Sequence, residues 1–471
     1  MNRLHKTPGV LAIATGMVLI TQQAAAADIS ADVESSLRSQ DTTRVWVHLG
    51  EQADLSGAAD LYTKTEKGRH VFETLNEIAK RTQRPILEHL DRSGVDYRSF
   101  WITNAIVVDV DRALLSWLSA RADVERIEAN PEVQMLRYTD RDGPTPEAAS
   151  TIEWNVEAIG APAVWAQGFT GQGVVVASAD TGVEWNHPAI VDSYRGSDGV
   201  RVDHDYHWFD GIDGLDTPYD DQGHGTFTTG QMTGDDGANQ IGVAPGAQWM
   251  ACKNMNAAGF GTPESYIACF EFFVAPTTTR GQSPNPDLAP DVVNNSWGCP
   301  TYEGCDADTL LDVVNATQAA GVMLIVSAGN SGPGCTSVED PPATYSEVLT
   351  VGAYDSNGGL AGFSSRGPSA YDRGMKPNLA APGVSVRSAI PGGGYSNGWS
   401  GTSMASPEVA AAAALLWSAQ PNLIGDIEGT RAILEGTTDA TRGPRCGGQR
   451  GYGNNMWGTG KLNIPNALDA R

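Results

Sequence analysis

The sequence lacks any apolar run long enough to cross a bilayer, which takes about 20 residues. The apolar run nearest the N-terminus, residues 9–20, follows Arg3 and Lys6 and leads into small residues ending at Ala27. A basic start, a short apolar stretch and small residues form the pattern of a secretory signal peptide. We therefore expect residues 1–27 to be removed and the protein to be secreted, extracellular or in periplasmic transit. An uncleaved anchor is the alternative, and the short run disfavours it.

Basic residues are scarce. The 471 residues include 31 Lys and Arg against 56 Asp and Glu, a formal net charge of −25. This balance excludes nucleic acid and anionic membrane as expected partners, because phosphate binding needs a basic surface. Residues 141–471 hold 15 basic and 36 acidic side chains, a net −21. A solvated acidic surface explains this excess, and calcium binding is the more specific alternative.

Cysteine is absent from the first half of the chain. The six cysteines are Cys252, Cys269, Cys299, Cys305, Cys335 and Cys446. An even number in an exported chain allows three disulfides, and no Cys-x-x-Cys pair indicates a zinc or redox site. The first half must fold without covalent links, which suits a segment that is later discarded.

A chain of this length predicts two or three folding units. Residues 28–140 show a small α+β pattern, with strands expected at 43–49, 99–110 and 124–135 and helices at 67–90 and 112–121. Residues 137–150 are polar and contain two prolines. We expect an exposed linker with the maturation cleavage at 141–153.

From residue 154 onward, short apolar runs alternate with helical patterns. This alternation predicts an α/β doubly wound, mostly parallel sheet with helices on both faces. Sites in such folds gather at the carboxyl ends of the strands. The expected strands are residues 173–179, 292–295, 321–327 and 348–353, and the expected helices are 262–273, 307–320 and the segment after Ser403.

Ser403 stands where a Gly/Ser turn opens into an alanine-rich helix. Thr402 is expected to cap that helix, whose first N–H groups would then face any anion formed in front of them. Pro407 removes the bond back to the carbonyl of Ser403, which a helix tolerates near this end. An ordinary capped core helix is the alternative for this segment alone. A serine becomes a strong nucleophile only beside a base that is itself oriented by a third group.

Candidates for these partners lie upstream. Asp180 follows a predicted strand directly, His224 lies between two glycines, and Asn330 follows another strand. A carboxylate can orient an imidazole that takes the serine proton, and an amide can donate to an oxyanion. Taken singly, each residue also fits a plain turn or loop. Together, at strand ends and a helix start, they indicate a catalytic group.

On these motifs the sequence resembles the subtilisin family of serine peptidases. The order Asp, His, Ser along the chain is that of subtilisins. Residues 43–135 resemble the inhibitory propeptide of that family, and residues 252–255, 269–273 and 296–300 are most similar to its bacillopeptidase F-type branch. The resemblance rests on residues 179–182, 223–226, 295–298, 328–330 and 401–407.

The resemblance implies a secreted serine endopeptidase, made as a self-processing precursor that acts through an acyl-enzyme. It implies Ser403 as nucleophile, His224 as general base and Asp180 as the residue that orients it. Asn330 and the Ser403 N–H would form the oxyanion hole. The implied partners are extended polypeptides and the chain's own propeptide as an intramolecular inhibitor, with the protein otherwise a monomer. The implied substrate-binding residues are Ser296, Trp297, Gly298, Gly329 and Asp340, the last giving a preference for basic residues.

No cofactor is expected for the chemistry, and a structural calcium is left open. Ala189 and Ile190 stand where family members with a strong calcium site commonly carry Asp, while the acidic loops 210–221 and 234–240 remain candidates. Phe227 and Thr229 replace the His and Ala usual in that helix, which should change packing more than chemistry. Fifteen disulfide connectivities are possible. We expect Cys299–Cys305 within one loop, Cys252–Cys269 across one strand–helix unit, and Cys335–Cys446 from the remaining pair.

Two other classes of protein share part of this pattern. A binding module with the same fold should lack one member of the Ser, His and Asp set, and none is missing. A lipase or esterase expects Gly-x-Ser-x-Gly with the serine first in the chain, whereas Ser403 comes last.

Overall fold

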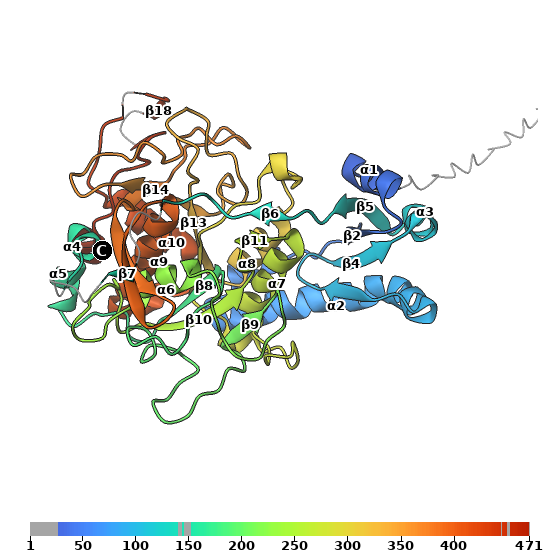
Figure 1. Cartoon of the computed structure of the whole chain (residues 1–471), viewed down its shortest axis with the longest axis horizontal. Helices are drawn as coiled ribbons and strands as arrows, with labels where there is room; N and C mark the ends of the chain where they lie inside the picture. Colours follow the sequence, from blue (N-terminus) through green and yellow to red (C-terminus); the bar gives the residue numbers. More distant parts are fainter. Residues whose placement is uncertain (1–26, 140–143, 146–151, 444, 450–452, 471) are drawn as a thin grey trace, which may run out of the picture.

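The computed structural model describes residues 27–139, 144–145, 152–443, 445–449 and 453–470. The expected signal peptide and most of the expected linker lie outside these residues. Two parts lie side by side, a small one built from the first part of the chain and a larger one built from the rest (Figure 1). Within the described ranges, no helix is long and apolar enough to cross a membrane.

The small part is a five-stranded sheet in the order β1-β5-β2-β4-β3. The long helix α2 starts at a capping box between Thr63 and Glu66 and ends at Gly94, whose φ of 64° is left-handed. The expected strand 99–110 is interrupted at residues 101–104, and α1 was not expected. The elements are β1 (Asp28–Ile29), α1 (Ala31–Ser39), β2 (Thr43–Leu49), α2 (Lys64–Ser93), β3 (Tyr97–Phe100), β4 (Ala105–Val110), α3 (Arg112–Ser119) and β5 (Val124–Ala129).

The large part contains a seven-stranded parallel sheet in the order β15-β14-β13-β12-β8-β10-β9. It confirms the α/β prediction, although β9, β10 and β15 were not expected. The strands are β8 (Val175–Asp180), β9 (Trp208–Asp210), β10 (Gln248–Lys253), β12 (Val292–Asn295), β13 (Met323–Ser327), β14 (Leu349–Tyr354) and β15 (Leu379–Pro382).

Helices cover both faces of this sheet. Along β13, Ile325 points into the core beneath α9, while Leu324 and Val326 point into the core beneath α7 and α8. The alanines of α9 leave little side-chain bulk, so this helix, buried from Thr402 to Trp417, can lie close to the strands. The helices are α4 (Trp154–Ala158), α5 (Ala161–Trp165), α6 (His224–Thr233), α7 (Pro263–Val274), α8 (Leu311–Ala319), α9 (Thr402–Ala419), α10 (Ile427–Gly436) and α11 (Ile464–Asp469).

Shorter strands lie outside the two main sheets. The antiparallel pair β16 (Val386–Ile390) and β17 (Gly394–Trp399) leads into α9. The two-residue strands are β6 (Val133–Gln134), β7 (Pro144–Thr145), β11 (Phe260–Gly261), β18 (Gly448–Gln449) and β19 (Gly453–Asn454).

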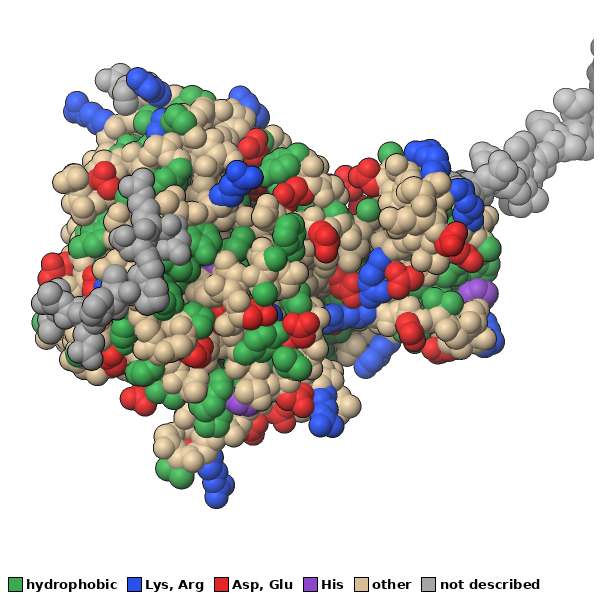
Figure 2. Space-filling model, in the orientation of Figure 1, with side chains coloured by type: hydrophobic (Ala, Val, Ile, Leu, Met, Phe, Trp, Pro, Cys, Tyr) green, Lys and Arg blue, Asp and Glu red, His purple; other side chains and the backbone are tan. Residues whose placement is uncertain are grey.

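The interface between the two parts is both apolar and charged. Trp46 and Phe100, on one face of the small sheet, belong to the same buried cluster as Phe272 of α7. Blue and red side chains meet along the junction of the two lobes (Figure 2). The ion pairs across it, each from the small part to the large one, are Arg44–Glu264, Lys64–Asp291 and Arg69–Asp287.

Candidate active site

Asp180 is the last residue of β8 and lies at the carboxyl edge of the parallel sheet. Its carboxylate oxygens lie 2.8 and 2.9 Å from Nδ1 of His224, and both side chains are buried. The backbone N–H of Thr181 and the hydroxyl of Thr228 also donate to this carboxylate. The carboxylate therefore holds Nδ1 and leaves Nε2 of the imidazole for another partner. Nε2 is buried and has no hydrogen bond within the described part of the chain.

His224 is the first residue of α6, directly after Gly223 with a φ of 106°. The helix start lies close against the Asp180 turn: a Cβ on Gly225 would lie 2.0 Å from the carbonyl oxygen of Gly182. Only glycine fits at residue 225 without displacing backbone. The Gly-His-Gly sequence thus brings imidazole and carboxylate together.

A buried acid that the sequence reasoning missed fixes this junction. Asp220 accepts from the N–H groups of Gly223 and Thr226 and from the hydroxyl of Thr181, at 2.7, 2.9 and 3.0 Å. The Thr181 hydroxyl in turn accepts from the N–H of Gly225. Burial raises the pKa of Asp220, and these donors oppose that rise. The side chain of Asp220 therefore links the turn after β8 to the start of α6.

Ser403 is the second residue of α9 and is fully buried. Its hydroxyl donates to the carbonyl oxygen of Ser296 at 3.2 Å. The ring of Tyr138 lies between this segment and His224: the ring centroids of Tyr138 and His224 are 5.1 Å apart, and a Cβ on Gly401 would lie 3.3 Å from Cβ of Tyr138. The structure thus brings the start of α9 and the imidazole to the same edge of the sheet.

Thr402 does not cap α9 as predicted. The residue before the helix is Gly401, and Thr402 is itself the first helical residue. Its hydroxyl donates to Oδ1 of Asn330 at 3.0 Å and accepts from the N–H of Gly329 at 3.1 Å, while its backbone N–H also donates to Oδ1 of Asn330 at 2.9 Å. Thr402 therefore orients the Asn330 amide through Oδ1 and leaves its NH₂ group for another partner. That group donates to the carbonyl oxygen of Arg137 at 2.8 Å.

Pro407 lies inside α9, where it leaves the carbonyl of Ser403 without its helical donor. The hydroxyl of Ser296 donates to that carbonyl at 3.1 Å instead, and it also contacts the hydroxyl of Ser406 at 3.0 Å. The hydroxyl of Ser296 thus binds the carbonyl of Ser403, and the backbone oxygen of Ser296 binds the hydroxyl of Ser403. The side chain of Ser296 supports the helix start, a role that the sequence did not reveal.

The other residues expected to bind substrate lie around the same edge. Trp297 is buried, donates from Nε1 to the carbonyl of Ala179 at 3.0 Å and stacks on Tyr266. Asp340 is 6% exposed and lies beside two glycines: a Cβ on Gly298 would be 2.9 Å from Cβ of Asp340, and one on Gly329 would be 3.9 Å from its Oδ2. Burial, with Glu339 and Glu303 nearby, raises the pKa of Asp340 to about 7.

Glu408 was also missed by the sequence reasoning. It follows Pro407 in α9, is completely buried, and accepts from Asn155 of α4 at 2.7 Å and Gln231 of α6 at 2.9 Å. Burial raises its pKa to about 8, and the two amide donors oppose the rise. The side chain of Glu408 therefore joins three helices around the site.

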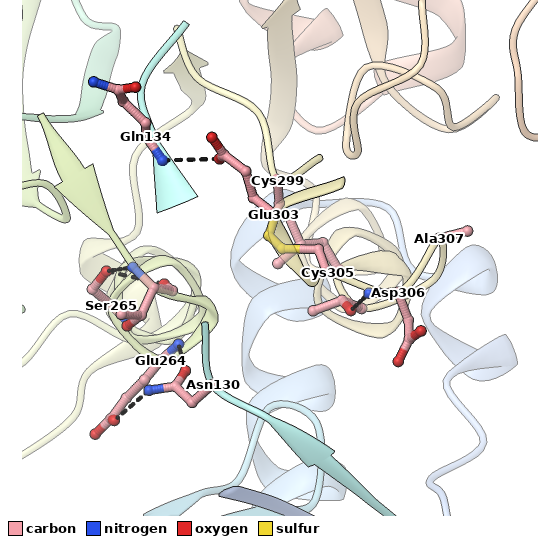
Figure 3. Close-up of a disulfide and its surroundings, with 12 residues drawn as sticks. Asn130, Gln134, Glu264, Ser265, Cys299, Glu303, Cys305, Asp306 and Ala307 are labelled. Atoms are coloured by element: carbon pink, nitrogen blue, oxygen red, sulfur yellow. Dashed lines mark hydrogen bonds between the residues drawn. A yellow bond between two sulfur atoms is a disulfide. The ribbon is translucent and has the colours of Figure 1, made fainter. Parts of the chain in front are cut away.

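The predicted disulfides are confirmed. The pairs Cys252–Cys269, Cys299–Cys305 and Cys335–Cys446 are all formed, and no cysteine is free. The first joins β10 to α7. The second closes a short loop whose Glu303 reaches the backbone N–H of Gln134 at 2.9 Å (Figure 3).

The candidate calcium loops are held by their own acids. Asp210 accepts from the N–H groups of Ile212, Asp213 and Leu215, and Asp236 accepts from those of Ala238 and Asn239. No group of three or more His, Cys, Asp or Glu side chains suited to a metal occurs in the described residues. A structural calcium remains a prediction.

Phe227 lies in an aromatic stack beside the site. The ring of Phe227 stacks on Trp399 with centroids 4.3 Å apart, and Trp399 also stacks on Tyr138 at 4.7 Å. Thr229 is buried within α6. An aromatic stack therefore flanks His224.

A parallel α/β sheet whose carboxyl edge carries this carboxylate, imidazole, hydroxyl and amide defines the class of subtilisin-like serine endopeptidases. A model of the subtilase family of peptidases matches residues 171–454. The chain belongs to the subtilase family, on its bacillopeptidase F branch, and is a serine endopeptidase.

Individual relatives agree with this placement. Bacillopeptidase F of Bacillus subtilis (strain 168) is 36% identical over 94% of this chain, which spans 32% of that protein's length. Subtilisin E of the same organism is 29% identical over 78% of this chain and 85% of its own length. Alkaline protease of Alkalihalobacillus alcalophilus is 32% identical over 64% of this chain and 68% of its own.

Proposed function

We propose that the chain is the precursor of a secreted endopeptidase in which Ser403, His224 and Asp180 hydrolyse peptide bonds of extended polypeptides through an acyl-enzyme. The observation that carries the proposal is the bond from His224 Nδ1 to Asp180, which leaves a buried Nε2 free to accept a proton. For attack, the hydroxyl of Ser403 leaves the carbonyl of Ser296 and donates to that nitrogen.

The oxyanion that forms on the substrate carbonyl needs donors already in place. The NH₂ group of Asn330, fixed through Thr402, is one of them. The backbone N–H of Ser403, in the first turn of α9, is the second donor we propose. Ser296, Trp297 and Gly298 would offer their backbone to an extended substrate.

The small part is proposed to be the propeptide, which assists folding and inhibits the enzyme until it is cut. The apolar and ionic contacts between the parts support this role. We further propose that the mature enzyme acts as a monomer outside the cell, without a required cofactor. The N-terminal sequence of the exported Ser403→Ala precursor, which should stay uncut, tests both the signal cleavage and the export.

Casein clearing by the processed enzyme tests the activity. We expect clearing by the wild type, its loss on treatment with a serine-directed fluorophosphonate, and none from Ser403→Ala. A subtilisin that loses its serine falls by about 10⁶ in kcat, which sets the scale of the loss. Efficient self-processing or casein hydrolysis by Ser403→Ala would contradict the mechanism.

Asp340 is proposed as the base of the primary specificity pocket, where its carboxylate would pair with Lys or Arg of a substrate. Its pKa of about 7 means that it is mostly neutral below that pH and mostly ionised above it. The preference for Arg over Phe peptides, measured as a ratio of kcat/KM, should therefore rise as pH increases through 7. A clear Phe preference at pH 8 rejects this role, and Asp340→Asn should show no such rise.

A further inference from the structure

The chain that leads out of the propeptide crosses the catalytic edge in an extended form. On one side, β6 pairs antiparallel with β11, with Gln134 opposite Phe260 and Val133 opposite Gly261. The N–H of Met135 continues this pairing by donating to the carbonyl of Gly259 at 2.8 Å. The segment is therefore held as an added strand up to two residues before Arg137.

On the other side, the chain is held by the strand that leads into α9. Thr139 and Ser400 exchange backbone hydrogen bonds of 2.9 Å in both directions. Further along, β7 pairs antiparallel with β17. Only residues 136–138 lie between the two anchored stretches, so the pairing on both sides fixes which bonds face the catalytic residues.

The carbonyl of Arg137 is the one that meets the oxyanion donor. Its oxygen accepts from Nδ2 of Asn330 at 2.8 Å, and Thr402 fixes the orientation of that amide. The side chain of Arg137 is exposed, so its position is set by the backbone and not by a filled pocket. A carbonyl bound at this amide is placed where charge develops in acyl transfer.

Tyr138, the next residue, lies on the side of the general base. Its ring is 5.1 Å from that of His224 and stacks on Trp399, which itself stacks on Phe227. Its hydroxyl accepts from Nε2 of Gln222 at 3.1 Å. The amine released from Tyr138 would therefore leave beside the imidazole that must protonate it.

We propose that the bond between Arg137 and Tyr138 is the one that the chain cuts in itself. This assignment rests on the proposed function, and it differs from the linker 141–153 in which the sequence places the cut. The aromatic stack of Trp399 and Phe227 would form a subsite for an aromatic residue on the leaving-group side.

The reaction balances with water as the only co-reactant. The Oγ of Ser403 bonds to the carbonyl carbon of Arg137 while its proton passes to Nε2 of His224. The bond from that carbon to the nitrogen of Tyr138 breaks, and His224 returns the proton to the departing amine. Water then hydrolyses the ester, giving the Arg137 carboxylate and a free Ser403 hydroxyl.

After the cut, the propeptide would stay bound to the enzyme. Its new C-terminal stretch retains the pairing of β6 with β11, and the disulfide-closed loop adds the bond from the N–H of Gln134 to Glu303 (Figure 3). Cleavage between residues 137 and 138 therefore produces an inhibited complex before it produces free enzyme.

The test is to fold the precursor from residue 28 and to measure the intact masses of both fragments at early times. We expect a propeptide that ends at Arg137, a mature chain that begins at Tyr138, and an uncut Ser403→Ala precursor. Fragments that meet inside 141–153 from the earliest time would overturn the assignment while leaving the proposed function standing. An uncut wild type that clears casein would also overturn it, whereas an uncut wild type with no activity would count against the proposed function itself.

Two proline variants provide a matched comparison. Tyr138→Pro turns the proposed scissile bond into a tertiary amide, whose ring crowds the leaving nitrogen. Cleavage there should therefore slow by more than about 100-fold, the scale of the loss when a reacting group is misplaced. Ala149→Pro, in the expected linker, should process at the wild-type rate. The opposite pattern would overturn the assignment. If the circular dichroism spectrum of Tyr138→Pro differs from that of the Ser403→Ala precursor, the variant is misfolded. The fragment masses of the wild type then test the cleavage site alone.

The aromatic subsite has its own readout. Removing a stacked ring with Tyr138→Ala should slow self-cleavage by roughly two- to tenfold, whereas Tyr138→Phe keeps the ring and should stay close to wild type. Equal rates for all three chains would remove the aromatic subsite from the proposal.

Discussion

The two parts of the molecule solve the problem of burying a sheet in different ways. In the peptidase part, helices of the same part cover both faces of the parallel sheet, and three disulfides cross-link it. In the small part, the proposed propeptide, one face of the sheet packs on α1, α2 and α3, while Trp46 and Phe100 on the other face pack against the peptidase part. We therefore expect the peptidase part to hold its site alone and the proposed propeptide to depend on the peptidase part.

The contrast extends to charge. Residues 141–471 carry a net −21 of the total −25, while the propeptide presents cations to them at Arg44, Lys64 and Arg69. These three cations meet acids of the large part across the interface, which is suited to the inhibitory role proposed for the small part. We therefore expect both the stability of the small part and its affinity for the peptidase part to depend on contacts across the interface.

The largest effect is expected when the propeptide is isolated. Residues 28–137 alone would expose Trp46, Phe100 and Val107, each worth about 1.5–3 kcal/mol when buried. Since small domains are stable by only about 5–15 kcal/mol, we expect the fragment to be largely unfolded. Circular dichroism should show little structure until a folded Ser403→Ala peptidase part is added. A cooperative thermal transition of the fragment alone would show that the small part is stable without the peptidase part.

The next effect concerns the disulfides, which only the peptidase part contains. In the loop-entropy model, a link across about 100 residues stabilises by about 4.7 kcal/mol. Cys335–Cys446 spans 111 residues, against 17 for Cys252–Cys269 and 6 for Cys299–Cys305. Replacing both cysteines of each pair with Ser should therefore lower the free energy of unfolding of the processed enzyme in that order. Urea denaturation measures it, and a reversed order would show that strain or local packing outweighs loop length.

A third prediction separates the two kinds of ion pair at the interface. Lys64 donates to Asp291 at 2.6 Å, and both side chains are largely buried, whereas Arg69 and Asp287 are exposed. Truncating one partner of a buried, hydrogen-bonded pair costs about 2–5 kcal/mol. Lys64→Met should thus weaken propeptide inhibition by more than tenfold, and the matched Arg69→Met should change it little. Equal increases in the inhibition constant of the two variants would mean that burial does not decide how much each ion pair contributes to binding.

The smallest effect, per pH unit, is the pH dependence of inhibition that arises from a proton taken up at the interface. Glu271 of α7 is buried beside Arg98 and Trp101 of the propeptide, and burial raises its pKa to about 8 from 4.5, with Arg98 opposing the rise. We expect this pKa to return toward 4.5 once the propeptide leaves. The complex then holds a proton that the free enzyme lacks between these pH values, so inhibition should weaken as pH rises, by at most about tenfold per unit.

The inhibition constant of the added propeptide between pH 5 and 8 measures this effect. In Glu271→Gln the dependence should flatten, because no proton is exchanged at that site. A slope that is unchanged in this variant would assign the pH dependence to other groups.

The sequence alone predicted a parallel sheet in the peptidase part, four of its seven strands and the residues that gather at its edge. The strand patterns at residues 292–295, 321–327 and 348–353 are local, because a buried parallel strand is apolar along its whole length. The disulfide pairs also followed from spacing and elimination. The positions of Asp180, His224 and Asn330 were recognisable because each lies close to the end or start of an expected element, with glycine next to His224 and Asn330 and two residues after Asp180.

Only the tertiary structure decided what these residues touch. Thr402 orients Asn330 instead of capping α9, Ser296 replaces the donor that Pro407 removes, and Asp220 joins two turns. None of these roles could be predicted from the local sequence, because Thr402, Ser296 and Asp220 each need a partner that lies at least 39 residues away. The same holds for the carbonyl of Arg137, since a polar linker composition cannot tell which of its bonds will meet the Asn330 amide. Composition and periodicity specify elements, whereas the geometry of a site depends on long-range contacts that form only when those elements pack.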